Sequence, residues 1–149
     1  MAAIVSPGRL FKADGAQQGI LSASGFPGRL VIFDYPGRRI TIRRGSLEAA
    51  DSKRVFQYGD DQVLPLVPVR IAGHDTQVHL DTGSANTLTL PRHFLAELAL
   101  KTQPADAGIA TLHSGSFPVS AAAVDGALEI GQYKVTVPEV RFSDVRLDR

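Results

Sequence analysis

The chain has 149 residues, of which 44% are hydrophobic, so it can form one domain with a substantial core and is neither disordered nor fibrous. Its formal net charge of +1 gives no electrostatic case for a nucleic acid or an acidic partner. Cysteine is absent, which excludes disulfides, thiol chemistry and cysteine–zinc sites.

Residues 1–18 have the pattern of an irregular lead-in. This start lacks both a charged first segment and a sustained apolar stretch, so we do not expect it to be a signal peptide. No apolar run in the chain approaches the roughly 18 residues that span a bilayer. We therefore expect no membrane segment, and the sequence leaves open whether the protein is periplasmic or cytoplasmic.

Fourteen glycines, nine prolines and many short runs of alternating residues predict an all-β domain with one short helix. The first convincing element is a hairpin of residues 30–34 and 39–43. Its turn, residues 35–38, contains Pro36 and Gly37, which suit the central positions of a type II turn. Arginines surround this hairpin and could contact anionic partners, although we favour a charged edge that resists aggregation. They are Arg29, Arg38, Arg39, Arg43 and Arg44.

The most informative stretch lies in the middle of the chain. Residues 66–71 alternate like a strand, residues 72–75 are turn material, and residues 76–80 form a second strand that ends at Asp81. A carboxylate that leaves an apolar strand is costly to desolvate unless it is hydrogen-bonded. The next residues supply hydroxyls, backbone N–H groups and a glycine that permits a sharp turn: Thr82, Gly83 and Ser84.

A strand near residues 88–90 and a short helix come after this motif. Pro91 would open the helix, with Phe94, Leu95 and Leu98 on one side. The order strand, turn, strand, Asp-Thr-Gly-Ser, strand and helix resembles the catalytic half of retropepsin-like (retroviral-type) aspartic proteases, including bacterial-type aspartyl protease domains. The resemblance is clear over residues 63–100. It implies an all-β, retropepsin-like acid protease barrel.

The resemblance also implies a role for each residue of the motif. Asp81 would be catalytic. Thr82 would hydrogen-bond across a pairing interface to its counterpart, Gly83 would let its backbone approach the carboxylate, and Ser84 would bond the outer oxygen of Asp81. A turn with no chemistry remains the alternative to this interpretation.

The order of the pieces differs from the family pattern. We expect one retropepsin-like domain over residues 19–149, with residues 19–50 as a hairpin unit similar to the family's second half and residues 62–149 as the Asp-Thr-Gly unit. The apolar-apolar-glycine strand of the second half is not found after Val124, whereas residues 19–22 resemble it, with Ser22 in place of glycine. Three explanations remain open: joined lobes of a tandem protein, which we favour, a permuted chain, or an accidental similarity.

The rest of the chain has the pattern of a loop at residues 101–108 and a series of short strands. These strands are expected near residues 109–112, 117–124, 127–130, 133–137 and 140–147. The family covers its substrate with a glycine-containing flap, and the best candidate is the segment His113, Ser114, Gly115 and Ser116. Residues 106–108 are a second candidate, and an ordinary surface turn is the alternative interpretation of both. The four histidines have no metal-ligand spacing, so neither a metal nor another cofactor is expected.

Peptide hydrolysis in this class needs two carboxylates that share one proton. Because the chain holds a single Asp-Thr-Gly, we expect an aspartic endopeptidase that acts on polypeptides as a homodimer, with one Asp81 from each copy. No nucleic acid partner is expected. Two alternatives stay open: an inactive retropepsin-like domain used for dimerisation or peptide binding, and an incomplete fragment of a two-lobed protease.

Overall fold

A computed structural model describes residues 23–58, 64–82, 84, 88–112, 115–136 and 139–144. The chain divides into two units, Met1–Ala49 and Ala50–Arg149, and each is described by itself. The lead-in expected at residues 1–18 and the second-half segment expected at residues 19–22 lie outside the described residues.

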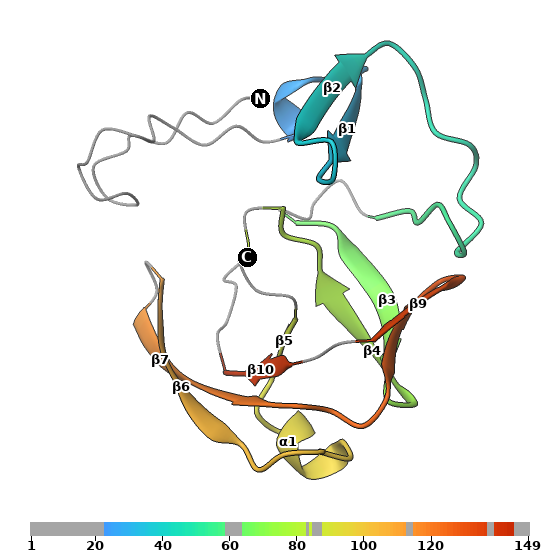
Figure 1. The fold of residues 1–149 in the computed structure, drawn as a ribbon. Coiled ribbons are helices and arrows are strands. Elements are labelled where there is room, and N and C mark those ends of the chain that lie inside the picture. The colour runs from blue at the N-terminus through green and yellow to red at the C-terminus, as the bar shows by residue number, and fades with distance from the viewer. Residues whose placement is uncertain are drawn as a thin grey trace. The chain divides into compact units, whose positions relative to one another are not determined.

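The N-terminal unit contains a short 3-10 helix, η2 (Ala23–Gly25), and an antiparallel hairpin of β1 (Leu30–Asp34) and β2 (Arg39–Arg43) (Figure 1). Both strands have the predicted bounds. The predicted type II turn is wrong, because Arg38 and not Gly37 has a positive φ, of 49°. The carboxylate of Asp34 accepts the N–H of Gly37 at 2.9 Å, and this side-chain bond fixes the turn differently.

The C-terminal unit contains two four-stranded sheets and one short helix in its described part, so the all-β prediction is confirmed. One sheet has the order β4-β3-β8-β9 and the other β5-β10-β7-β6 (Figure 1). The elements are β3 (Leu66–Ile71), β4 (His74–His79), β5 (Thr89–Leu90), α1 (Phe94–Glu97), β6 (Ala105–Leu112), β7 (Gly115–Ala122), β8 (Ala127–Ile130), β9 (Tyr133–Thr136) and β10 (Val140–Phe142). Within the described residues no helix is long and apolar enough to cross a membrane.

The core of the C-terminal unit draws apolar side chains from both sheets and from the helix. Strand β3 shows the alternation that was expected, with Val69 and Ile71 buried and Pro68 and Arg70 exposed. The helix begins after Pro91, as predicted, and buries Phe94. The buried cluster consists of Val69, Ile71, Leu88, Leu90, Phe94, Leu98, Ala122, Val124, Leu128, Val140 and Phe142.

The loop expected at residues 101–108 is wrong in its second half, because β6 already begins at Ala105. The register of β6 against β7 shifts between Asp106 and Ile109, and Gly108 has a φ of 92°. The carboxylate of Asp106 accepts the N–H of Gly108 at 2.9 Å. These features form a bulge, which hides the period-two pattern that marks a strand in the sequence.

Candidate active site

The strand pair that leads to Asp81 is joined by a tight two-residue turn. Ala72 and Gly73 both have positive φ, 46° and 86°, as a type I′ hairpin turn requires. The turn packs closely on the segment before β8, where a Cβ on Gly126 would lie 2.7 Å from the Cα of Ala72. The register of β3 against β4 runs without a break from Ile71↔His74 to Leu66↔His79. The hairpin is therefore a well-defined support for the segment after β4.

Asp81 lies just beyond the last backbone bond of this hairpin. Leu80 still donates its N–H to the carbonyl of Pro65 at 2.8 Å, and the chain then turns, since the N–H of Ser84 donates to the carbonyl of Asp81 at 3.2 Å. Asp81, Thr82 and Ser84 are exposed, whereas Gly83 lies outside the described residues. The carboxylate thus leaves the sheet on a hydrogen-bonded turn, at the place in the sequence where the motif predicts it.

The chain is anchored again immediately after the motif. Leu88 and Leu90 are buried, and their carbonyls accept the N–H groups of Arg141 at 3.0 Å and Ser143 at 2.9 Å. Strand β5 pairs in parallel with β10, with Phe142 opposite Leu90. The Asp81 segment is therefore fixed at one end to the β3–β4 hairpin and at the other to β10, a strand from the far end of the chain. Asn86 and Thr87 lie outside the described residues.

Two features near the motif were not predicted from the sequence. Leu80, next to Asp81, leaves 56% of its surface exposed, although the alternation of β4 groups it with the half-buried Val78. The second feature is the pairing of β5 with β10, two short segments in which neither sequence indicates the other as its partner. A parallel pair without a helical crossover has no short-range sequence signature, so only the three-dimensional structure reveals it.

Two of the flap candidates, Gly115 and Ser116, lie in a long hairpin. Strands β6 and β7 pair from Ala105↔Ala121 to Leu112↔Gly115, and Gly115 and Ser116 open β7. The hydroxyls of Thr111 and Ser116 lie 3.4 Å apart across the pair. His113 and Ser114 lie outside the described residues. The glycine of the candidate segment thus begins one arm of a hairpin with eight residues in each strand.

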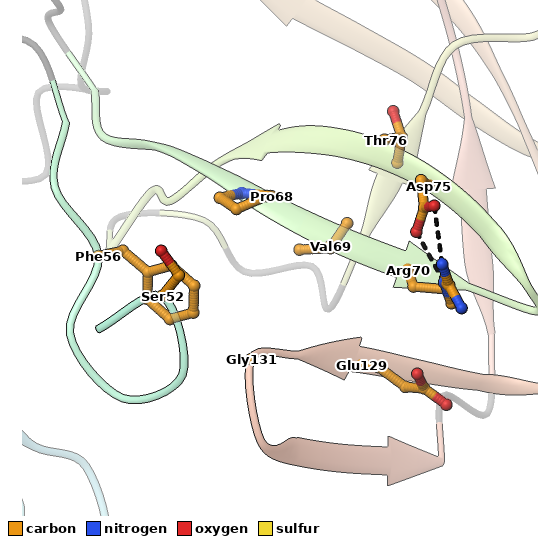
Figure 2. A pocket seen from close by; sticks show the side chains of 9 residues that line it. All are labelled: Ser52, Phe56, Pro68, Val69, Arg70, Asp75, Thr76, Glu129 and Gly131. Atoms are coloured by element: carbon orange, nitrogen blue, oxygen red, sulfur yellow. Dashed lines mark hydrogen bonds and ion pairs between the residues drawn. The ribbon is translucent and has the colours of Figure 1, made fainter. Parts of the chain in front are cut away.

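A shallow cavity of about 340 Å³ lies on one face of the β4-β3-β8-β9 sheet, and Asp81 does not line it (Figure 2). Arg70 donates to both carboxylate oxygens of Asp75, at 2.7 and 2.8 Å. Glu129 lies on the neighbouring β8 and pairs with Lys134 of β9 at 3.0 Å. The charges therefore alternate across the four strands and balance one another. The cavity offers no unmatched charge to a ligand, and we therefore assign no ligand to it.

The segment of residues 51–56 closes one side of this cavity. The carboxylate of Asp51 accepts the backbone N–H groups of Lys53, Arg54 and Val55 at 2.7–2.9 Å. These bonds, first among them that from Val55, hold the pKa of Asp51 well below its usual range. The carbonyl of Lys53 in turn accepts the N–H of Gln132, at 3.1 Å, which fastens the segment to the β8–β9 turn.

The histidines and carboxylates of the described residues were compared with the side chains that a metal site requires. No group of three or more His, Asp or Glu side chains in them is placed to hold a metal ion. His93 instead packs on Phe94, with ring centroids 4.5 Å apart, and lies 3.9 Å from Glu97. His79 is exposed at the end of β4, on the opposite side from Val78.

The sequence of the C-terminal unit matches a known family. A family model described as "Aspartyl protease" matches residues 67–148, which is over half of the chain. The chain belongs to this aspartyl protease family. The match begins in β3 and includes Asp81 and the β6–β7 hairpin, while the β1–β2 hairpin lies outside it. Comparisons with curated proteins and with solved structures gave no match.

Proposed function

We propose that the chain is an aspartic endopeptidase in which Asp81 supplies one carboxylate of a catalytic pair. The observation that carries this proposal is the Asp-Thr-Gly-Ser turn, which leaves the β3–β4 hairpin and lies inside the region matched by the aspartyl protease family. A second copy of the chain supplies the other Asp81, because the sequence has a single Asp-Thr-Gly.

Two facing carboxylates separate their ionisations, so that one is ionised and the other is protonated at the same pH. The ionised carboxylate takes a proton from a bound water, whose oxygen attacks the carbonyl carbon of the peptide bond. The protonated carboxyl gives its proton to the carbonyl oxygen. When the tetrahedral intermediate collapses, the carboxyl that took the water's proton gives it to the nitrogen, and the C–N bond breaks. The other carboxylate takes back a proton from a hydroxyl of the intermediate, so the pair returns to its starting state without a metal or a covalent intermediate.

The residues around Asp81 have supporting roles in this proposal. Thr82 bonds to its counterpart in the second copy and holds the two turns in register, Gly83 allows close backbone approach, and Ser84 bonds the outer carboxylate oxygen. The β6–β7 hairpin covers an extended polypeptide substrate, and the segment His113, Ser114, Gly115 and Ser116 acts as the flap that excludes water from the reacting bond. The interface of such a dimer is isologous.

The test is hydrolysis of a peptide library by the wild type and by Asp81→Asn, between about pH 3 and 7, with and without an aspartic-protease inhibitor. We expect inhibitor-sensitive cleavage by the wild type and a loss of at least about a hundredfold in the variant, since removing an acid–base group costs about 10²–10⁴-fold. The matched control is Asp125→Asn, which changes an exposed aspartate paired with Lys101 at 3.3 Å and should cleave like the wild type.

Undiminished cleavage by Asp81→Asn would overturn the assignment. A folded wild type that cleaves nothing in this range would also overturn it and would favour the second candidate, a non-catalytic domain that binds peptides or dimerises. The observation that favours this second candidate is the single Asp-Thr-Gly in the chain, because one chain then lacks the second carboxylate that catalysis needs.

A further inference from the structure

The β1–β2 hairpin carries a contiguous apolar surface that the proposed protease function does not use. Val31 pairs with Ile42 and Phe33 with Ile40, so these four side chains share one side of the two-stranded sheet. The ring of Tyr35 stacks on that of Phe33, with centroids 6.5 Å apart. We call these five residues the apolar hairpin face.

The apolar hairpin face is largely open to solvent. The exposed fractions are 38% for Phe33, 65% for Tyr35, 62% for Ile40 and 44% for Ile42. Single exposed apolar residues are ordinary on a protein surface, whereas a contiguous group on one sheet face marks an interaction surface. A lone two-stranded hairpin is also only marginally stable in water, so contact with an apolar phase on this face would stabilise it.

The hairpin that carries the apolar face is strongly basic. Residues 29–44 contain five arginines and one aspartate, a formal charge of +4, while the rest of the chain carries −3. Asp34 is already engaged, since its carboxylate accepts from Arg39 at 3.2 Å and from the N–H of Gly37. The side chains of Arg39 and Arg43 alternate with those of Ile40 and Ile42, so they lie on the opposite side of the sheet. Of the other arginines, Arg38 lies at the turn, and Arg29 and Arg44 flank the open end of the strands. Cationic groups therefore stand at both ends of the face.

We propose that the apolar hairpin face docks on the surface of a membrane that contains anionic lipids. Binding at a membrane interface needs apolar and aromatic side chains that enter the boundary with the acyl chains, together with basic groups that meet the lipid phosphates. The hairpin supplies both in one element. In this interpretation the arginines meet lipid phosphates in addition to protecting a strand edge, as the sequence predicts. The hairpin lies on the membrane surface and does not span it.

The composition of the face favours lipid over other anionic partners. A single-stranded nucleic acid is bound by aromatic rings that stack on its bases. Three of the five residues of the face, Val31, Ile40 and Ile42, are aliphatic and have no ring to offer. The face itself carries no hydrogen-bonding side chain other than the hydroxyl of Tyr35. A hydrocarbon boundary requires none.

The experiment uses the full chain and a single fluorescent reporter, which is available because the sequence has no tryptophan. Tyr35→Trp places the reporter on the apolar hairpin face, and Tyr133→Trp places it on β9, where the tyrosine is similarly exposed at 55%. Each protein is titrated with vesicles of phosphatidylcholine alone and of phosphatidylcholine mixed with phosphatidylglycerol. We expect a blue shift of emission, and quenching by brominated lipid, only for Tyr35→Trp and only with the anionic vesicles.

Charge variants then test the electrostatic part without changing the packing of the face. In the Tyr35→Trp background, Arg38→Gln with Arg44→Gln should weaken vesicle binding by about 25-fold, since each arginine near an anionic surface contributes about fivefold. Lys101→Gln, an exposed cation of the C-terminal unit, should leave binding unchanged. Phe33→Ser with Ile40→Ser should abolish it.

Several results would overturn the proposal. Equal binding to neutral vesicles, or no binding to either kind, would remove the anionic surface as the partner. A shift of the Tyr35→Trp emission that depends on protein concentration and not on lipid would assign the face to a second copy of the chain. A shift produced by an acidic polypeptide or by single-stranded DNA, but not by vesicles, would assign it to those partners instead.

Discussion

Strand β10 connects the core to the Asp81 segment. The variant Phe142→Ala tests how much the packing of this strand contributes to the free energy of unfolding. Phe142 and Val140 leave no exposed surface. The strand lies between β5 and β7, with Phe142 opposite Leu90 on one side and Ser120 on the other. The variant removes the ring that packs in the buried cluster and leaves the backbone bonds of the strand in place.

The expected cost comes from this burial. Truncation of a fully buried phenylalanine to alanine lowers the free energy of unfolding by about 3–5 kcal/mol, because apolar contacts are lost and a cavity remains. That is a large share of the roughly 5–15 kcal/mol that stabilises a typical domain. For a unit of about 100 residues, each kcal/mol lowers the melting temperature by about 4–8 °C. We therefore expect a decrease of more than about 10 °C.

The assay is urea unfolding monitored by circular dichroism, with thermal unfolding as a second measurement. Ile109→Ala is the matched control, because Ile109 also lies in a strand but is 70% exposed, and its truncation should change the free energy by less than about 0.5 kcal/mol. If Phe142→Ala were destabilised by less than about 1 kcal/mol, the ring would not be enclosed as described. The reasoning that links β10 to the Asp81 segment would then fail.

Two further predictions concern the sheet that supports Asp81. In urea unfolding, Gly131→Ala should lower the free energy of unfolding by about 1 kcal/mol or more beyond the effect of Gly73→Ala. Both glycines have positive φ, but only a Cβ on Gly131 would collide with the carbonyl of Lys53. Equal effects of the two variants would refute this close contact. The hydrogen bond and charge of Arg70 hold the pKa of Asp75 below its usual range. The stability that this pair contributes is therefore present above the unfolded pKa, about 3.9, and is lost as the pH falls through the lower folded value. Asp75→Asn and Arg70→Gln should each flatten the loss of stability below about pH 4, and an unchanged slope in both would contradict the pairing.

Local patterns predicted the strands that carry a clear alternation. Strand β3 and the two strands of the first hairpin have the bounds that their sequences indicate, and the helix follows Pro91, beginning at Phe94. The motif at Asp81 could be found from the sequence because its functional groups belong to consecutive residues.

The features that were missed depend on side-chain bonds and on distant partners. The carboxylates of Asp34 and Asp106 each capture a nearby N–H, which changes a turn type in one case and accompanies a bulge in the other. Such bonds compete with backbone patterns and leave no periodic trace. The pairing of β5 with β10 and the exposure of Leu80 are set by tertiary contacts, which propensity and periodicity do not encode.

The central claim is that two copies of the chain each supply one Asp81 to a shared site. Titrating a fixed amount of wild type with Asp81→Asn, under conditions where subunits exchange, tests it most directly. Mixed dimers hold one ionisable carboxylate and should be inactive, so peptide cleavage should fall to about half at equal amounts and about a tenth at ninefold excess. Cleavage that stays constant while the variant is added, with subunit exchange confirmed by a labelled copy, would contradict the account.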